Sequence, residues 1–176
     1  MLKSRLCIAF FAFAVGCAPA QKPLTDYVNP MLGTATLWDS VDLGFKPTKR
    51  TWGAEVFPGS SLPNAMVQVS PVTKFHSGAG YQYEDSVIYG FTHTNKGHWN
   101  LCHIPLLPVT GTPTPGDYCS PFSHERESAA PGYYQVFLDR YGVDAQLSST
   151  LRCAFHKYTY PAGAAASLLA DLQRSN

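Results

Sequence analysis

The chain has 176 residues, of which 45% are hydrophobic, and this is enough to form one globular domain with a core. Charged residues make up only 14% and the formal net charge is +1, so the sequence predicts neither a nucleic-acid partner nor an acidic tail. With 14 glycines, 14 prolines and 13% aromatic residues, the composition favours a turn-rich β protein.

The N-terminus has the pattern of an export signal. Lys3 and Arg5 precede the apolar run LCIAFFAFAV, which is too short to span a bilayer but long enough for a signal peptide. The next residues, AVGC, resemble a bacterial lipobox in which Ala14 replaces the usual Leu, so Cys17 is predicted to be lipidated. The alternative is ordinary cleavage near CAPA, with Cys17 incidental. Either way we expect export, and we assign residues 1–17 to the signal and 18–25 to a linker.

Strand patterns dominate the remaining chain, after an irregular stretch between Thr34 and Gly59 that we interpret as long loops. Runs that alternate apolar and polar side chains, or that are rich in β-branched and aromatic residues, predict strands. The predicted strands are Ala65–Ser70, Ser86–Phe91, Ile104–Thr110, Tyr133–Leu138, Val143–Ser149 and Leu151–Tyr160.

Two further patterns complete the fold prediction. Asp139–Gly142 has the composition of a tight hairpin turn, and the strict alternation in Val143–Ser149 indicates a sheet with one solvated face. The Ala-rich run PAGAAASLLADL, at 161–172, is compatible with either a strand or a helix. We therefore predict an all-β fold, a single antiparallel β-sandwich domain.

Chemically active residue types crowd between Tyr89 and Gly111. They are His93, Lys96, His98, Trp99, Cys102 and His103. Imidazole and thiolate are zinc ligands, and a Cys beside a His can act as a nucleophile. However, the spacing matches no zinc signature, and Cys102 and His103 would point to opposite faces of a strand. No third group that would orient a Cys–His pair is evident, so both kinds of chemistry are the weaker alternatives here.

Two carboxylate pairs are candidates for glycoside hydrolysis, which needs two carboxyl groups held across the scissile bond at a defined gap. Glu84 and Asp85 are adjacent, and Glu125 and Glu127 flank Arg126, so neither pair provides that gap by itself. We interpret the first as a solvated turn and the second as a polar loop in which Arg126 neutralises its neighbours.

An odd number of cysteines remains once Cys7 and Cys17 are set aside. Cys102, Cys119 and Cys153 allow at most one disulfide, whose pairing the sequence leaves open. At least one of them is predicted to be a buried free thiol.

Six blocks of the chain resemble, in order and spacing, the N-terminal domain of glycoside hydrolase family 92, the calcium-dependent exo-α-mannosidases. The blocks are DYVNPMLGT, FPGSSLPNAMVQVSP, GYQYEDSVIYGFTHT, LLPVTG, FSHERESAAPGYYQVFL and LRCAFHKYTYP. The resemblance covers residues 26–176. It implies a β-sandwich joined to a C-terminal (α/α)6 barrel, with the active site in the cleft between the two domains.

The same resemblance implies inverting hydrolysis of α-mannosides in N-glycans or mannans. It places the catalytic carboxylates and the calcium ligands in the barrel, before which this sequence ends. We therefore expect a fragment or truncated product that is inactive alone, carries no catalytic residue and binds no calcium itself. The implied partners are a mannose-containing glycan, the barrel domain and, through the lipid anchor, a membrane of the bacterial periplasm or cell surface.

One block departs from the family pattern. Many members have a Gly/Ser-rich stretch after HTH, whereas this chain reads HTNKGHWNLCHIP, which leaves the glycan linkage, and mannose itself, open. On the wall of a sugar cleft, Trp99 would offer an apolar face to a pyranose ring and His93 a hydrogen bond to a hydroxyl.

We accordingly predict His93, Trp99 and Cys102 as substrate-binding residues. The alternative is that these side chains only pack the seam between the domains. A second function class also stays open, in which the sandwich is a non-catalytic carbohydrate-binding surface lipoprotein.

Overall fold

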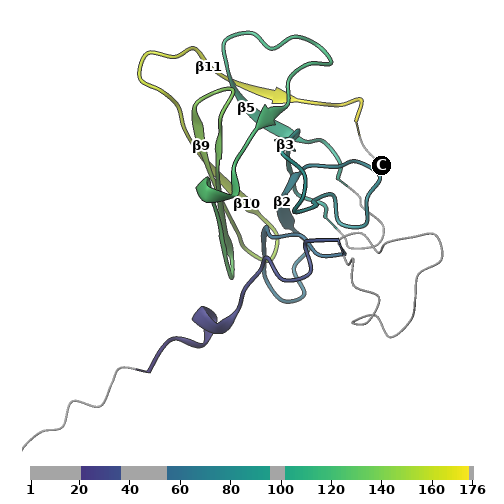
Figure 1. Cartoon of the computed structure of the whole chain (residues 1–176), viewed down its shortest axis with the longest axis vertical. Coiled ribbons are helices and arrows are strands. Elements are labelled where there is room, and N and C mark those ends of the chain that lie inside the picture. The colour runs from purple at the N-terminus through teal and green to yellow at the C-terminus, as the bar shows by residue number, and fades with distance from the viewer. Residues whose placement is uncertain (1–20, 37–54, 96–101, 175–176) are drawn as a thin grey trace, which may run out of the picture.

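The computed structural model describes residues 21–36, 55–95 and 102–174, and all structural statements below refer to them. Short strands make up nearly all of its regular structure, and every pair of named strands is antiparallel (Figure 1). Two 3-10 helices, η1 (Leu24–Tyr27) and η2 (His124–Arg126), are the helical elements within the described ranges. The predicted all-β, antiparallel fold class is confirmed.

The four-stranded sheet contains the strands that the sequence predicts best. Its order is β10-β9-β8-β7, with β7 (Glu127–Ala130), β8 (Tyr133–Leu138), β9 (Val143–Ser149) and β10 (Ala154–Thr159). The bounds of β8 and β9 equal the predicted ones, and the turn Asp139–Gly142 joins them with Leu138 opposite Val143. Within β10, only Ala154–Thr159 of the predicted Leu151–Tyr160 is strand, because Thr150 and Cys153 form a turn in which Thr150 N–H donates to Cys153 O.

The five-stranded sheet brings together strands that are distant in sequence. Its order is β1-β2-β4-β5-β11, with β1 (Ser60–Ser61), β2 (Gln68–Val72), β4 (Gly90–Thr92), β5 (Leu106–Thr110) and β11 (Ala166–Ala170). The Ala-rich run is therefore a strand at its C-terminal half, paired with β5. The predicted strand Ala65–Ser70 begins later, at Gln68.

The prediction of one continuous strand over Ser86–Phe91 is wrong. β3 (Val87–Ile88) pairs with β6 (Ser120–Pro121) in a separate two-stranded sheet, while β4 joins the five-stranded sheet. The break falls at Tyr89, beside Gly90. The φ of Gly90 is 155°, and an added Cβ would lie 2.9 Å from Pro105 Cβ, so this position leaves little room for a side chain. Alternating polarity alone does not reveal such a change of sheet.

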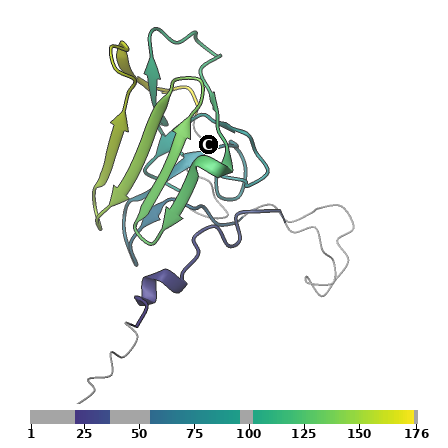
Figure 2. The same ribbon diagram turned by 60° about the vertical axis from the view of Figure 1, so that its left-hand side comes forward.

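The core lies between the two larger sheets. Alternate residues of β8 and β9 point inward and are buried, including Tyr134, Val136 and Leu147. They form one hydrophobic cluster with residues such as Phe91 and Leu107 of the opposite sheet. Figures 1 and 2 show the four-stranded sheet packed beside the shorter strands of the other layer. This arrangement is a β-sandwich, and it leaves the outer face of β7–β10 facing solvent.

The described residues also bear on the cysteines and on membrane spans. Cys102, Cys119 and Cys153 are all free, and Cys102 is buried, so the predicted buried free thiol is present. Among the described residues, no helix is long and apolar enough to cross a membrane. The predicted signal, Cys17, and most of the loop between Thr34 and Gly59 lie outside the described residues.

Candidate functional site

The segment from His93 to His103, which we call the histidine loop, leaves the end of β4 and returns to β5. Its residues 96–101, which include Trp99 and His98, lie outside the described residues. Its two ends, His93–Asn95 and Cys102–His103, are described. They show how the sandwich holds this loop.

Asn95 anchors the first end of the histidine loop. Its side chain is 1% exposed, and its amide nitrogen donates to Gln68 O at 2.9 Å and to Thr92 Oγ1 at 2.9 Å. The Cys102 thiol donates to Asn95 Oδ1 at 3.3 Å, so the second end is fastened to the first. Because a buried amide is stable only when its polar atoms are paired, this network holds both ends of the loop against β2.

Cys102 has no exposed surface, and burial raises the pKa of its thiol to about 11. A protonated, enclosed thiol is a poor nucleophile, since the thiolate is the reactive form. The predicted role of Cys102 in substrate binding stays a prediction. In this arrangement the Cys102 thiol bonds Asn95 and so helps to hold the loop. It has no exposed surface for a sugar to contact.

His93 bonds to a residue that sequence reasoning did not single out. Its Nε2 lies 2.7 Å from Nε2 of His156 on β10, and Nδ1 of His156 lies 2.6 Å from the hydroxyl of Tyr158. This His–His–Tyr chain links the five-stranded sheet to the four-stranded one. No short motif signals it, because His93 and His156 are 63 residues apart.

Burial favours the neutral form of the two imidazoles near pH 7. Burial lowers the pKa of His93, and burial together with the charge of His93 lowers the pKa of His156 to about 4. Two neutral proton arrangements satisfy the chain, and they differ in whether Nδ1 of His93 is a donor or an acceptor. No described residue bonds to that nitrogen.

The metal alternative draws no support from the described residues. Within 21–36, 55–95 and 102–174, no group of three or more His, Cys, Asp or Glu is placed to hold an ion. His98, one of the four candidate ligands, lies outside these ranges.

The first carboxylate pair, Glu84 and Asp85, forms structural hydrogen bonds to neighbouring segments. Glu84 accepts the backbone N–H of Thr36 at 2.9 Å, and Asp85 accepts the hydroxyl of Thr73 at 2.8 Å. Burial acts to raise the pKa of Glu84, but the hydrogen bonds, first that from the Thr36 backbone, outweigh it and lower the pKa. Each carboxylate thus ties a turn to a neighbouring segment.

The interpretation of residues 123–128 as a polar loop neutralised by Arg126 is wrong. Ser123 caps η2, and Glu127 begins β7 with its side chain 2% exposed. Arg126 pairs with Asp139 at 3.1 Å and lies over the ring of Phe137. The partner of Arg126 is thus Asp139, which lies outside the local pattern, and not the neighbouring glutamates.

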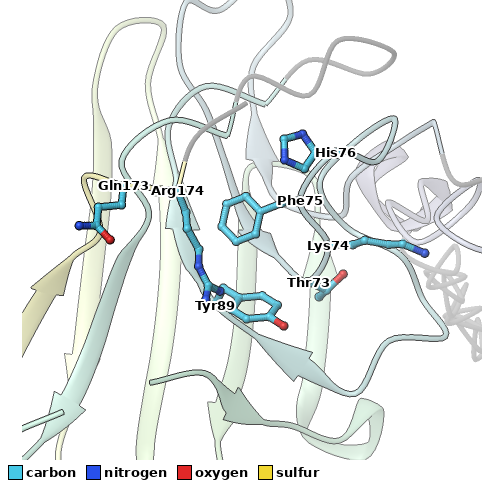
Figure 3. Close-up of a pocket in the computed structure, with 7 residues that line it drawn as sticks. All are labelled: Thr73, Lys74, Phe75, His76, Tyr89, Gln173 and Arg174. Carbon is cyan, nitrogen blue, oxygen red and sulfur yellow. The ribbon is translucent and has the colours of Figure 1, made fainter. Parts of the chain in front are cut away.

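A cavity of about 440 Å³ lies at the opposite ends of β2 and β4 from the histidine loop (Figure 3). It is lined by residues that include Thr73, Phe75 and Tyr89, and by Arg174. The guanidinium of Arg174 lies 5.2 Å from the centre of the Tyr89 ring, toward which Figure 3 shows it directed. Stacked cation and ring contacts of this kind fasten the C-terminal residues of the described chain to the sandwich.

Asp171 holds the same C-terminal segment from the other side. Its carboxylate accepts a hydrogen bond from Tyr118 and lies 3.8 Å from Nε of Arg174. Burial acts to raise the pKa of Asp171, but the bonds from Tyr118 and from two backbone N–H groups outweigh it and lower the pKa. The cavity was not anticipated from the sequence, because its two walls are about 85–100 residues apart along the chain.

Comparison with known proteins agrees with the fold and with the six sequence blocks. The family model described as the Glycosyl hydrolase family 92 N-terminal domain matches residues 27–176. A search of curated proteins finds no significant match.

Solved structures provide the closer comparison. The chain is similar to the family GH92 alpha-mannosidase BT3965 from Bacteroides thetaiotaomicron, with 32% identity, a TM-score of 0.70, and coverage of 86% of this chain and 20% of that one. It is also similar to the family GH92 inverting mannosidase BT2199 from Bacteroides thetaiotaomicron VPI-5482, with 28% identity, a TM-score of 0.67 and the same coverage, 86% and 20%. The gh92 family glycosyl hydrolase ccman5 aligns at 32% identity and a TM-score of 0.57 over 68% of this chain and 18% of that one. The chain therefore spans about a fifth of the length of these structures.

Proposed function

Because the chain belongs to glycosyl hydrolase family 92, whose N-terminal domain it matches over residues 27–176, we propose that it forms one wall of the substrate cleft of an exo-acting α-mannosidase. The proposed reaction is the inverting hydrolysis of α-mannosides in N-glycans or mannans. The proposal is supported by the family match and by the two mannosidases among the similar structures. Catalysis itself is assigned to the C-terminal domain that the resemblance implies.

The proposed role of this chain rests on one observation, that hydrogen bonds fix both ends of the histidine loop. Both loop ends are fixed by the buried Asn95 network, so the residues between them have a rigid base. A site whose binding groups stand on rigid elements loses less conformational entropy when the ligand binds. Trp99 then provides the apolar face for a pyranose, and Nδ1 of His93 bonds a hydroxyl.

His93 suits a hydroxyl ligand because of its partner, His156. A sugar hydroxyl is both a donor and an acceptor, and the His–His–Tyr chain can leave Nδ1 of His93 in either state without creating a charge. A neutral imidazole also avoids the cost of desolvating a cation when the cleft closes. We assign His93 to positioning and binding, and no catalytic residue to this chain.

The calcium that the resemblance implies is proposed to be held elsewhere in the enzyme. Calcium takes six to eight oxygen ligands, and the described residues offer no cluster of three or more ligating side chains. Where the complete enzyme requires the ion, we place it in the catalytic domain, and the work of the described residues is to bind and orient the sugar.

The proposal is tested by kinetics of the complete enzyme, with a soluble aryl α-mannoside as substrate. Trp99→Ala and His93→Ala each remove a contact of about 1–3 kcal/mol, so kcat/KM should fall by roughly tenfold to a hundredfold. The melting temperature of Trp99→Ala should change little, since a core Trp→Ala would instead cost about 3–5 kcal/mol. Phe155→Ala is the matched control, because this exposed aromatic lies on β10, on the outer face of the other sheet.

Three outcomes would contradict the proposal. A destabilised Trp99→Ala protein whose folded fraction keeps normal kcat/KM would make the loop a packing element of the domain seam. Turnover of the mannoside by this 176-residue chain alone would place the catalytic groups within it. Mannan binding without any turnover by the complete protein would favour the non-catalytic lipoprotein function.

A further inference from the structure

The outer face of the four-stranded sheet carries an ordered row of polar side chains. Gln135 of β8 lies opposite Gln146 of β9 in the register, and Ser128 of β7 lies opposite Gln135. Their neighbours Tyr134, Val136 and Ala145 are buried in the core, so these three side chains point to the solvent side. Figure 2 shows the sheet with this face turned away from the other layer.

These side chains form a connected hydrogen-bond network around Asp144. Gln135 Nε2 donates to Asp144 Oδ1 at 2.8 Å, and Gln146 Nε2 donates to Asp144 Oδ2 at 2.7 Å. The hydroxyl of Tyr133 donates to Gln135 Oε1 at 2.9 Å, which fixes the orientation of that amide. The network holds four side chains in one arrangement before any ligand arrives.

Hydrogen-bonding capacity remains at each member of the network. Each amide nitrogen has a second N–H, and each carboxylate oxygen has a further lone pair. No described residue takes these positions. The face thus presents donors and acceptors side by side, held by their mutual bonds.

One end of the row opens into a cavity of about 350 Å³, which is within the range of small-ligand sites, about 300–1,000 Å³. Its lining includes Gln135, Phe137 and Asp144 of the sheet and Arg126 of η2. The guanidinium of Arg126 lies 3.2 Å from the centre of the Phe137 ring and is held by Asp139. We call the cavity and the adjoining Gln146 the outer groove.

The charges of the outer groove do not favour an anion. Arg126 is paired with Asp139, while Asp144 and the exposed Glu125 add negative charge to the same region. An anion accepts hydrogen bonds only and an ammonium donates only, whereas a hydroxyl does both. A mixed row of fixed donors and acceptors is therefore complementary to a ligand with many hydroxyls.

We propose that the outer groove binds a neutral glycan, at a site on the opposite sheet from the histidine loop. Glycan hydroxyls bond the spare N–H groups of Gln135 and Gln146 and the spare lone pairs of Asp144, with Tyr133 beside them as an apolar ring. This site goes beyond the proposed cleft, because it needs neither the loop nor a catalytic domain. It would keep the protein on a polysaccharide.

The test is affinity gel electrophoresis of the full chain in gels that contain yeast mannan, dextran or heparin. Retardation by mannan, by dextran or by both is expected, and heparin should have no comparable effect. Gln146→Leu and Asp144→Ala should each weaken the apparent affinity by about tenfold, because each removes direct hydrogen bonds to the ligand. Circular dichroism of each variant checks that the sheet is intact, and Gln146→Leu leaves Asp144 its bond from Gln135.

Two further variants separate this site from others. Gln173→Ala removes an exposed amide from the cavity of Figure 3 and should leave retardation unchanged. Trp99→Ala is measured beside them, because retardation by mannan that depends on Trp99 alone would come from the proposed cleft. Absence of retardation by both neutral polysaccharides, retardation by heparin alone, or retardation that survives both groove variants would overturn the proposal. Loss of retardation in Trp99→Ala with normal binding by the groove variants would overturn it as well.

Discussion

At the scale of single residues, Glu127 is a carboxylate whose side chain is almost fully buried. Its carboxylate accepts hydrogen bonds from the hydroxyls of Tyr81 and Tyr134 and from Nδ1 of His124. Both tyrosines are fully buried, and the Tyr81 and Tyr134 pKa values are raised, mainly by burial and then by the charge of Glu127. The carboxylate therefore joins β7 and β8 to the segment before β3 and is enclosed from substrate.

Glu127→Ala should lower the free energy of unfolding by about 2–6 kcal/mol, because it leaves two buried hydroxyls without an acceptor, at about 1–3 kcal/mol each. The neighbouring exposed Glu125 provides the matched control, and Glu125→Ala should change the same quantity by about 0.5 kcal/mol or less. Urea unfolding followed by circular dichroism measures both. Equal, small effects of the two changes would show that Glu127 is not a structural centre.

At the scale of elements, the His–His–Tyr chain is a polar contact between two sheets that otherwise meet through apolar side chains. His93 follows β4, and His156 and Tyr158 both belong to β10. The ring of Phe91 packs against both His156 and Tyr158. The contact thus ties the base of the histidine loop to the opposite sheet, and it depends on neutral imidazoles.

Acid should weaken this contact. The pKa of His156 is about 4 in the folded chain against 6.5 in the unfolded one, so the unfolded chain binds more protons between these values. The stability that the neutral ring contributes is complete above about pH 6.5 and is lost as the pH falls toward 4. The free energy of unfolding should fall by up to about 1.4 kcal/mol per pH unit in this window through His156.

Urea titrations at several pH values between 7 and 4 measure this dependence. His156→Gln keeps a hydrogen-bonding side chain but cannot titrate, so its stability should fall less steeply with acid than that of the unchanged chain. Parallel slopes for the two proteins would contradict the assigned role of His156.

At the scale of the whole molecule, the chain is a sandwich that spans about a fifth of the length of the similar mannosidase structures. Its predicted export and lipid anchor concern the first 17 residues, which lie outside the described ones. Together with the proposed glycan contacts, an anchor would keep the protein near extracellular polysaccharide. We propose a periplasmic or surface location on this basis.

Cys17→Ser should release the protein from membranes into the soluble fraction. One acyl chain gives only marginal membrane binding, whereas the several chains of a lipoprotein cysteine hold a protein stably. Cys7→Ser is the matched control, because Cys7 lies in the apolar run that is removed on cleavage. Fractionation of cells that export each variant is the measurement, and unchanged partitioning of Cys17→Ser would argue for cleavage near CAPA instead.

Local sequence patterns were sufficient for much of the fold. Alternation over six or seven residues located β8 and β9, and Asp139–Gly142 marked the turn between them. The reason is that successive side chains of a strand point to opposite faces of the sheet. When one face is solvated and the other is buried, apolar and polar residues therefore alternate. The order of six blocks likewise indicated the family, to which the chain belongs.

Tertiary structure alone decided which residues meet. Tyr81 reaches Glu127 across 46 residues and His93 reaches His156 across 63, and no local pattern contains either pairing. The break between β3 and β4 lies beside Gly90, which Pro105, a residue of another segment, approaches closely. Residue types and their spacing therefore determined the class of fold, and the resemblance of the six blocks indicated the family and the cleft to which the sugar-binding residues are assigned. Sheet register, which sets contacts between distant segments, decided the buried carboxylate, the histidine chain and the outer groove.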